Sequence, residues 1–457
     1  MSFPVRPASA VFLVSALALT GCGGGSDSSG GDSPSAPAFG ASASGTLSAW
    51  AFDNADDVGK ARLAYAQSQL GGVQVKLDQT SFDSQKFTTR AASGDLPDVV
   101  QMDRALIGTY AAQGLIKPLD QCYAAHDVDA SKLFYPAVTE SVTYQDQIWA
   151  VPQFYQPPLM LLNNRVMKQA GVTADQIDTS NMDGLTAAAQ KMYKASGGTP
   201  TRLGVDPVAT GAPEMWILNS GGRLMDENGK PALDDPKNVT ALEGLKKLSD
   251  AQGGHAKIKS FSDAFDTFGD NNQFVKDQVG AQPDAQWYLN VLSPTADKQD
   301  LAAVPFKGPD GKPFTFALGT SFVIPAAAKN PDAACAWALS LVSQPSWEAA
   351  AKARSETLAK DGGINTGLFT GSPAADTAIR QQYVKPTGNA GFDQAISSFY
   401  DIVSTGKSIG VSPAGEAIKN ELRNAVTAAL LGQKQPQQAL ADAQAAAMRS
   451  YDQVADQ

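Results

Sequence analysis

The chain has 457 residues, which is too long for one ordinary hydrophobic core, so we expect two lobes. Hydrophobic residues make up 43% and charged residues 18% of the sequence, a composition typical of a folded globular protein. The net charge of −10 argues against nucleic-acid binding, because an acidic surface repels phosphate groups. With 2 histidines and 3 cysteines, a clustered zinc site is not expected, and we predict neither a metal nor a cofactor.

The N-terminal segment has the pattern of an export signal. An apolar run at residues 11–19 is shorter than the roughly 20 residues of a membrane-spanning helix and is typical of a secretory signal peptide. Residues 19–22 (LTGC) resemble a bacterial lipobox, which implies cleavage before Cys22 and a diacylglycerol on its thiol. We therefore predict a signal peptide over residues 1–21. The mature protein would be lipid-anchored through Cys22 on the extracytoplasmic face of the bacterial cell membrane.

Residues 22–45 are rich in glycine, serine, proline and alanine. Such a segment has little apolar surface to bury, so we expect a flexible tether between the anchor and a folded body. No second apolar stretch long enough for a membrane span follows it in the sequence. The body is therefore expected to be soluble and extracytoplasmic.

The body begins with alternating strand and helix patterns. We expect strands at residues 47–52, 73–77 and 98–103, and helices at 56–70 and 84–93. This alternation is typical of a parallel sheet with crossover helices, in which ligands bind beyond the carboxyl ends of the strands. That rule selects the residues at and directly after the ends of the first and third strands: Phe52, Asp53, Asn54, Asp103 and Arg104.

One later helix has clear boundary signals. Asn330 can cap it, Pro331 fits its first turn, and Pro345 is expected to end it. Cys335 lies on the apolar face of this helix, so we expect it to pack in the core. A disulfide between Cys335 and Cys122 is the alternative in an oxidising compartment.

Known catalytic motifs do not account for the chain. Gly406-Lys407-Ser408 resembles the end of a phosphate-binding loop, but Asp401 stands where that loop needs glycine. His126 and His255 do not lie in a recognisable triad setting. Paired carboxylates would support glycoside hydrolysis, but among 46 acidic residues no pair stands out. A binding protein is therefore favoured over an enzyme.

The tryptophans are more informative. Trp337 lies on the capped helix and is expected to be a core residue. Trp216 and Trp287 lie beside polar, glycine- or proline-containing segments, which is a better setting for a cleft. Sugar rings stack their C–H faces on indole, and binding sites combine such apolar planes with a few polar groups. These positions therefore favour a carbohydrate ligand.

Four parts of the sequence carry a family resemblance. They are residues 92–100 (ASGDLPDVV) with 114–119 (GLIKPL), 144–152 (YQDQIWAVP) with 161–164 and 170–172, 279–287 (VGAQPDAQW), and 319–325 (GTSFVIP) with 329–334. In order and spacing they resemble the extracellular solute-binding proteins of family 1, the maltose-binding-protein-like lipoproteins that serve ABC importers. Gln147, Gln282 and Pro283 depart from the family pattern near the expected cleft, so they bear on which sugar is bound.

The resemblance implies an α/β, two-lobed fold of the periplasmic-binding-protein type II, with a hinge and an interlobe ligand cleft. Lobe one would comprise residues 46–153 and 314–345, and lobe two residues 154–313 and 346–457. The ligand must touch both lobes, because it shifts an open–closed equilibrium only through its higher affinity for the closed state. The candidate ligand-binding residues are Phe52, Asp53, Asp103, Arg104 and Ser321 from lobe one, and Phe154, Tyr155, Trp216, Asp284 and Trp287 from the hinge and lobe two.

The implied function is capture of a mono- or oligosaccharide by a monomeric lipoprotein, which delivers it to the permease subunits of an ABC transporter. No catalytic residue is expected. Two alternatives stay open. One is an extracytoplasmic glycan-acting enzyme, which would need a general acid of raised pKa and a second carboxylate at a fixed separation. The other is a binding lipoprotein that feeds a sensor.

Overall fold

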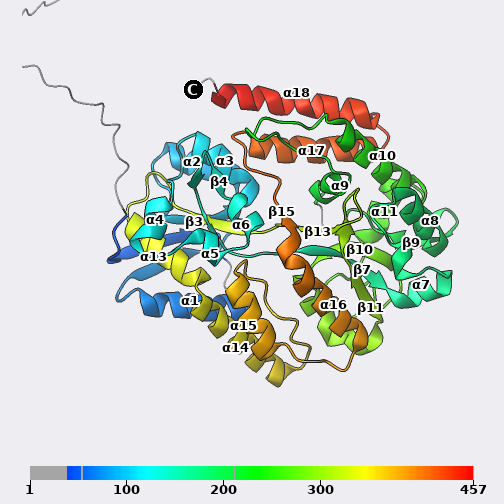
Figure 1. Ribbon diagram of the computed structural model, residues 1–457, viewed down its shortest axis with the longest axis horizontal. Coiled ribbons are helices and arrows are strands. Elements are labelled where there is room, and N and C mark those ends of the chain that lie inside the picture. The colour runs from blue at the N-terminus through cyan, green and yellow to red at the C-terminus, as the bar shows by residue number, and fades with distance from the viewer. Residues whose placement is uncertain (1–38, 53–54, 210–211, 456–457) are drawn as a thin grey trace, which may run out of the picture. The chain divides into compact units, whose positions relative to one another are not determined.

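A computed structural model describes residues 39–52, 55–209 and 212–455 (Figure 1). The predicted signal peptide, the lipidation site Cys22 and the candidate residue Asp53 lie outside the described residues. Within the described ranges, every helix is too short or too polar to cross a bilayer. Residues 39–45, which the sequence assigns to the tether, contact the folded body. The backbone N–H of Gly40 donates to the Asp332 carboxylate at 2.9 Å, and Phe39 packs against the core.

The first sheet contains the predicted strands. Its order is β2-β1-β3-β14-β6. The strands are β1 (Thr46–Trp50), β2 (Gln74–Asp78), β3 (Val99–Asp103), β14 (Thr320–Val323) and β6 (Val151–Pro152). β1 is parallel to β2 and β3, whereas β14 is antiparallel to β3 and to β6. The predicted alternation is confirmed, with α1 (Asp57–Gln69) and α2 (Ser84–Ala92) as the crossover helices.

Local capping explains where these helices begin. The Asp56 side chain accepts from the Gly59 N–H before α1, and Asn330 accepts from the Ala333 N–H before α13 (Pro331–Val342). The chain then leaves α1 through Gly72, whose φ of 102° is a backbone conformation that glycine adopts without strain. Pro345 does not stop α13, which already ends at Val342. It lies in the first turn of the next helix, α14 (Gln344–Asp361), where its missing N–H is not needed.

The second sheet has the order β11-β7-β10-β9-β8. Its strands are β7 (Pro158–Asn163), β8 (Lys194–Ser196), β9 (Thr199–Val205), β10 (Val279–Ala285) and β11 (Leu301–Val304). Only β9 and β10 are parallel neighbours, so their carboxyl ends meet at one edge. Every residue of β7 and β10 is buried, as expected for central strands that are covered on both faces.

Helices connect and cover the two sheets. α14 packs on α1 beside the first sheet, although the predicted boundaries place it in lobe two. α17 (Gly415–Leu430) and α18 (Pro436–Ala455) pack on each other and on α10 (Pro236–Asp250), at the top of Figure 1. α17 also contacts η1 (Arg104–Leu106) and α3 (Ile107–Ala112), which follow the first sheet. The C-terminal helices therefore contact helices that connect the strands of each sheet.

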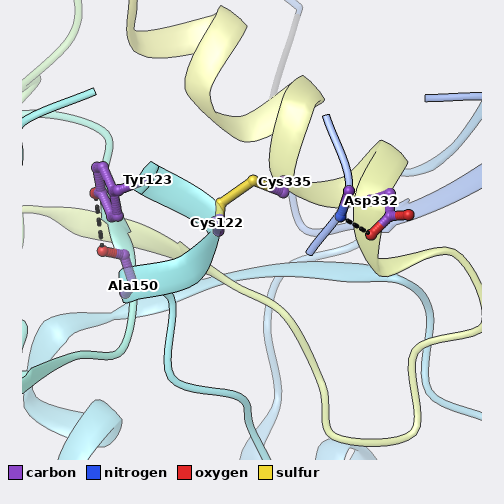
Figure 2. Close-up of a disulfide and its surroundings, with 6 residues drawn as sticks. Cys122, Tyr123, Ala150, Asp332 and Cys335 are labelled. Atoms are coloured by element: carbon purple, nitrogen blue, oxygen red, sulfur yellow. Dashed lines mark hydrogen bonds between the residues drawn. A yellow bond between two sulfur atoms is a disulfide. The ribbon is translucent and has the colours of Figure 1, made fainter. Parts of the chain in front are cut away.

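The buried core joins distant parts of the chain. Trp337 is fully buried, as predicted, and its ring packs against those of Phe52 and Phe322. Cys335 is also buried, and of its two expected states the disulfide with Cys122 of α4 (Asp120–Ala125) is the one present (Figure 2). The two Cα atoms are 5.8 Å apart, within the range that a disulfide needs. This bond links two helices whose cysteines are 213 residues apart in sequence.

Candidate ligand-binding cleft

A pocket of about 870 Å³ lies where β9 and β10 end. Asp206, Gln282 and Asp284 line it from these two strands and the turn after β9. Other groups come from further parts of the chain: Gln156, Leu318, the aromatic residues Phe265, Phe268 and Trp287, and the α17 residues Arg423, Val426, Thr427 and Leu430. The volume lies in the range of small-molecule sites, and the lining mixes apolar surfaces with a few polar groups.

A second pocket, of about 1120 Å³, is larger but has a less specific lining. It lies between the β4–β5 hairpin (Thr143–Tyr144 and Gln147–Ile148), residues 222–229 and residues 408–413. None of the candidate ligand residues that the structure describes lines it. Of its carboxylates, Glu140, Asp146 and Glu227 are exposed and Asp226 is half-buried. We therefore regard the smaller pocket, which we call the cleft, as the candidate site.

The register of β9 and β10 brings two carboxylates to the cleft. Val205 lies opposite Ala281, so Asp206 follows one strand at the level where Asp284 approaches the end of the other. The Val208 N–H donates to one oxygen of Asp206 at 3.1 Å. Asp284 accepts at one oxygen from the Ala285 N–H at 2.9 Å and at the other from the Gln282 side chain at 3.0 Å. Each carboxylate is therefore held in place and retains lone pairs for a ligand.

Burial makes both carboxyl groups weak acids. It raises the pKa of Asp284 to about 7, and the negative charge of Asp206 adds to this rise. The Gln282 and Ala285 hydrogen bonds oppose the rise in pKa without cancelling it. Burial likewise raises the pKa of Asp206 to about 6. The cleft therefore contains two carboxyl groups that change charge near neutral pH.

A chain of buried side chains supports Asp284 from behind. Gln273 donates from Nε2 to the Gln282 side-chain oxygen at 3.0 Å and to the Tyr288 hydroxyl at 2.9 Å. The Tyr288 hydroxyl donates in turn to the Thr267 carbonyl at 2.8 Å. Because Gln282 contacts Asp284 directly, this network fixes the position of the carboxylate before any ligand arrives.

Aromatic rings form one wall of the cleft. Trp287 is the first residue of α12 (Trp287–Leu292) and is half-buried. Its ring stacks on that of Phe268, with centroids 6.2 Å apart and planes inclined by 17°. It also meets the Tyr288 ring edge-on at 5.6 Å. An apolar plane thus lies beside the hydrogen-bond acceptors of the cleft.

Asp103, the last residue of β3, and Arg104, which follows it, already have hydrogen-bond or ion-pair partners within the protein. One oxygen of Asp103 accepts from the Ala105 N–H at 2.9 Å, and the other forms an ion pair with Lys419 of α17. Arg104 is buried, and burial lowers its pKa to about 10. Its guanidinium donates to the Ser321 hydroxyl at 3.2 Å and to the carbonyls of Ala317 and Phe154. Arg104 and Ser321 therefore join the end of β3, β14 and the segment between β6 and β7, and neither lines the cleft.

Four aromatic candidates are packed elsewhere. Phe52 lies in the core described above, and Tyr155 is buried with its hydroxyl donating to the Val403 carbonyl at 3.1 Å. Trp216 is buried against Phe306. Phe154 is half-buried and its ring meets that of Trp347 edge-on. Of the ten candidates, Asp284 and Trp287 are the two described ones that line the cleft.

Two of the packed candidates hold residues near the cleft. The Trp216 indole N–H donates to the Pro207 carbonyl at 2.8 Å, directly after Asp206. The Phe154 carbonyl accepts from Arg104, two residues before the cleft residue Gln156. Both candidates are therefore hydrogen-bonded at or near the backbone of residues that line the cleft.

Sequence reasoning missed several cleft residues. Asp206 directly follows the buried strand β9, so the rule applied to the first strands would have selected it in lobe two as well. The sequence marks Gln282 only as a departure from the family pattern, and not as a ligand-binding residue. Phe268 lies in an irregular stretch after α11 (His255–Ser262) and carries no periodic signal.

The sequence comparison identifies the class of protein. The model of the family described as bacterial extracellular solute-binding protein matches residues 53–343. This match covers more than half of the chain, and the protein belongs to that family. The predicted family is thereby confirmed, and its members are binding proteins.

Solved structures show the same fold. CpMnBP1, solved with mannobiose bound, is 23% identical with a TM-score of 0.71, over 88% of this chain and 99% of that one. Lmo0181 of Listeria monocytogenes, an ABC substrate-binding protein in complex with cycloalternan, is 15% identical with a TM-score of 0.70 over 89% and 99%. The GacH receptor of Streptomyces glaucescens is 21% identical with a TM-score of 0.63 over 90% and 99%. The predicted two-lobed α/β fold is confirmed.

Proposed function

We propose that this protein captures a carbohydrate in the cleft and delivers it to the permease subunits of an ABC transporter. The observation that carries the proposal is the pairing of buried, fixed carboxylates with an aromatic wall, Asp206 and Asp284 beside Trp287. Sugar hydroxyls donate to carboxylates, and sugar C–H faces pack on aromatic rings. The ligands named for the similar solved structures, mannobiose and cycloalternan among them, support the same class.

Selectivity would come from the fixed polar groups. A ligand that leaves one buried donor or acceptor unpaired loses about 1–3 kcal/mol of binding free energy. The network behind Asp284 cannot readily adjust, because each of its side chains is already hydrogen-bonded. The cleft should therefore distinguish sugars by the position of their hydroxyl groups.

Closure of two lobes would complete the site. We keep the proposed division into residues 46–153 with 314–345 and 154–313 with 346–457, with α14 moved to lobe one because it packs on α1. Asp103 is half-exposed beside α17, so it is the described lobe-one candidate best placed to meet a ligand in a closed form. A role for Asp53 also remains part of the proposal.

A glycan-hydrolysing enzyme is the second candidate. Two carboxyl groups of raised pKa in one cleft are what a hydrolase would need for a general acid and its partner. The family of binding proteins favours capture without chemistry. Recovery of the ligand after incubation separates the two functions, because only an enzyme would return a cleaved sugar.

A thermal-shift panel of mono-, di- and oligosaccharides tests the function. A saccharide present at 100 times its Kd should raise the free energy of unfolding by about 2.7 kcal/mol, because only the folded protein binds it. Peptides, polyamines and metal salts form the control panel. A shift with one of these and with no saccharide would contradict the proposed ligand class, and cleaved product would favour the enzyme.

We also propose that Cys22 carries a lipid anchor, on the strength of the lipobox resemblance. Replacing Cys22 with alanine should move the protein from the membrane fraction to the soluble exported fraction, because the acylated thiol is lost. Immunoblotting of the two fractions measures the change, with the unaltered chain as the control. Continued membrane retention of a variant whose signal peptide has been removed would refute the anchor.

A further inference from the structure

Phe268 is the most exposed large hydrophobic side chain among the described residues. Its side chain is 74% exposed, although it lines the cleft. Leaving a phenylalanine ring in water is unfavourable. Because the ring lines the cleft, its exposed face is open to a bound ligand.

The turn that carries the exposed Phe268 side chain is held in place by hydrogen bonds. The Gly269 N–H donates to the Asp266 carbonyl at 3.0 Å, and the Asn271 N–H donates to the Asp266 carboxylate at 3.1 Å. The Thr267 carbonyl, directly before Phe268, accepts from the buried Tyr288 hydroxyl. The turn that carries Phe268 is therefore tied to the same network that supports Asp284.

Burial decreases stepwise from the polar groups of the cleft to Phe268. Asp206 and Asp284 are buried, Trp287 is half-buried, and Phe268 is exposed. Trp287 and Phe268 have nearly parallel rings. A sugar ring held by the carboxylates would meet Trp287, and a second ring linked to it would lie farther out, at the level of Phe268.

The surroundings of Phe268 do not favour a protein partner. Its near neighbours in sequence include the exposed residues Asp263, Asp266, Asp270 and Asn271. Leu431, the other exposed large hydrophobic among the described residues, is not part of the cleft. A lone aromatic ring among acidic and amide side chains suits a sugar ring, which also offers hydroxyls to those groups.

We propose that Phe268 sets the length of ligand that the cleft prefers, by contacting a saccharide ring beyond the one held by Asp206 and Asp284. The preferred ligand is then an oligosaccharide and not a monosaccharide. This inference rests on the proposed carbohydrate-binding function. It adds a residue that the sequence did not indicate, and it narrows the expected mono- or oligosaccharide to an oligosaccharide.

The test compares Phe268→Ala with the unaltered protein by titration calorimetry. The probes are mannose, mannobiose and mannotriose, then glucose, maltose and maltotriose, and the homologous series of any other saccharide that the thermal-shift panel identifies. Phe268→Ala should weaken trisaccharide binding about tenfold and leave monosaccharide binding within about twofold. Phe268→Tyr, which keeps the aromatic face, should bind like the unaltered chain.

Leu431→Ala is the matched control, because it removes an exposed hydrophobic side chain outside the cleft. The inference would be overturned if Phe268→Ala lost affinity equally for saccharides of every length, lost no affinity, or bound more tightly. Each of these results would leave the proposed function in place. Tighter binding of monosaccharides than of oligosaccharides by the wild-type protein would also overturn the inference. Failure of every saccharide to bind the wild-type protein would overturn the proposed function and this inference together.

Discussion

Replacing Asp284 with alanine is expected to weaken saccharide binding about a hundredfold. The carboxylate is buried and is held by Gln282 and the Ala285 N–H, so it accepts ligand hydroxyls without first having to reorganise. A hydrogen bond to a charged group contributes about 1.5–3 kcal/mol, and a hundredfold loss of affinity corresponds to about 2.7 kcal/mol, which lies within that range. Titration calorimetry measures it. Asp175→Ala, which changes an exposed aspartate of η2 (Ala174–Gln176) outside the cleft, is the control and should bind normally.

The pH dependence gives a second readout of the same residue. Ligand hydroxyls favour the ionised carboxylate, and the pKa of Asp284 in the empty protein is about 7. Affinity should therefore be highest above pH 7 and should fall by up to about tenfold per pH unit below it. Asp284→Asn cannot ionise, so its affinity should depend less on pH, with the remaining slope due to Asp206 near pH 6. A pH-independent wild-type affinity would contradict this role.

The stability of the empty protein should respond in the opposite direction. The unfolded pKa of an aspartate is about 3.9, and the folded value of Asp284 is raised to about 7. The folded state therefore holds its proton more tightly, which favours folding below about pH 4 and is lost as the pH rises through 7. At pH 8, Asp284→Asn should accordingly be more stable than the wild type without ligand while binding saccharide less well.

Removing the disulfide is expected to have the largest effect on stability. Cys122 and Cys335 are 213 residues apart, so their bond closes a very long loop in the unfolded chain. Loss of a bond of this kind typically costs about 2–5 kcal/mol. The double replacement Cys122→Ser and Cys335→Ser should lower the free energy of unfolding by that amount, as measured by urea denaturation.

Saccharide affinity provides the internal control for this variant. Neither cysteine lines the cleft, so ligand binding at 25 °C should remain within about threefold of the wild type. The single variant Cys335→Ser should lose a similar amount of stability, because one change already breaks the bond. A loss below about 1 kcal/mol in both variants would show that the bond contributes little to the fold.

The cleft illustrates how far strand-end reasoning extends. The family resemblance selects residues 279–287. Asp284 and Trp287 of that segment do line the cleft. Phe52 and Arg104 also follow strands, but they turn toward the core and toward β14. Position after a strand predicts proximity to a sheet edge, whereas side-chain direction depends on which neighbours are buried around it.

Local rules in this chain were enough to locate its first strands and helices, the cap at Asn330 and the core position of Trp337. These features depend on residues close in sequence, whose hydrogen bonds and apolar spacing act within a turn or a strand. The disulfide, the Asp206–Asp284 pair and the stacking of Phe268 on Trp287 depend instead on contacts across long loops. Folding alone brings those residues together, because the free energy that aligns them comes from burying both sheets.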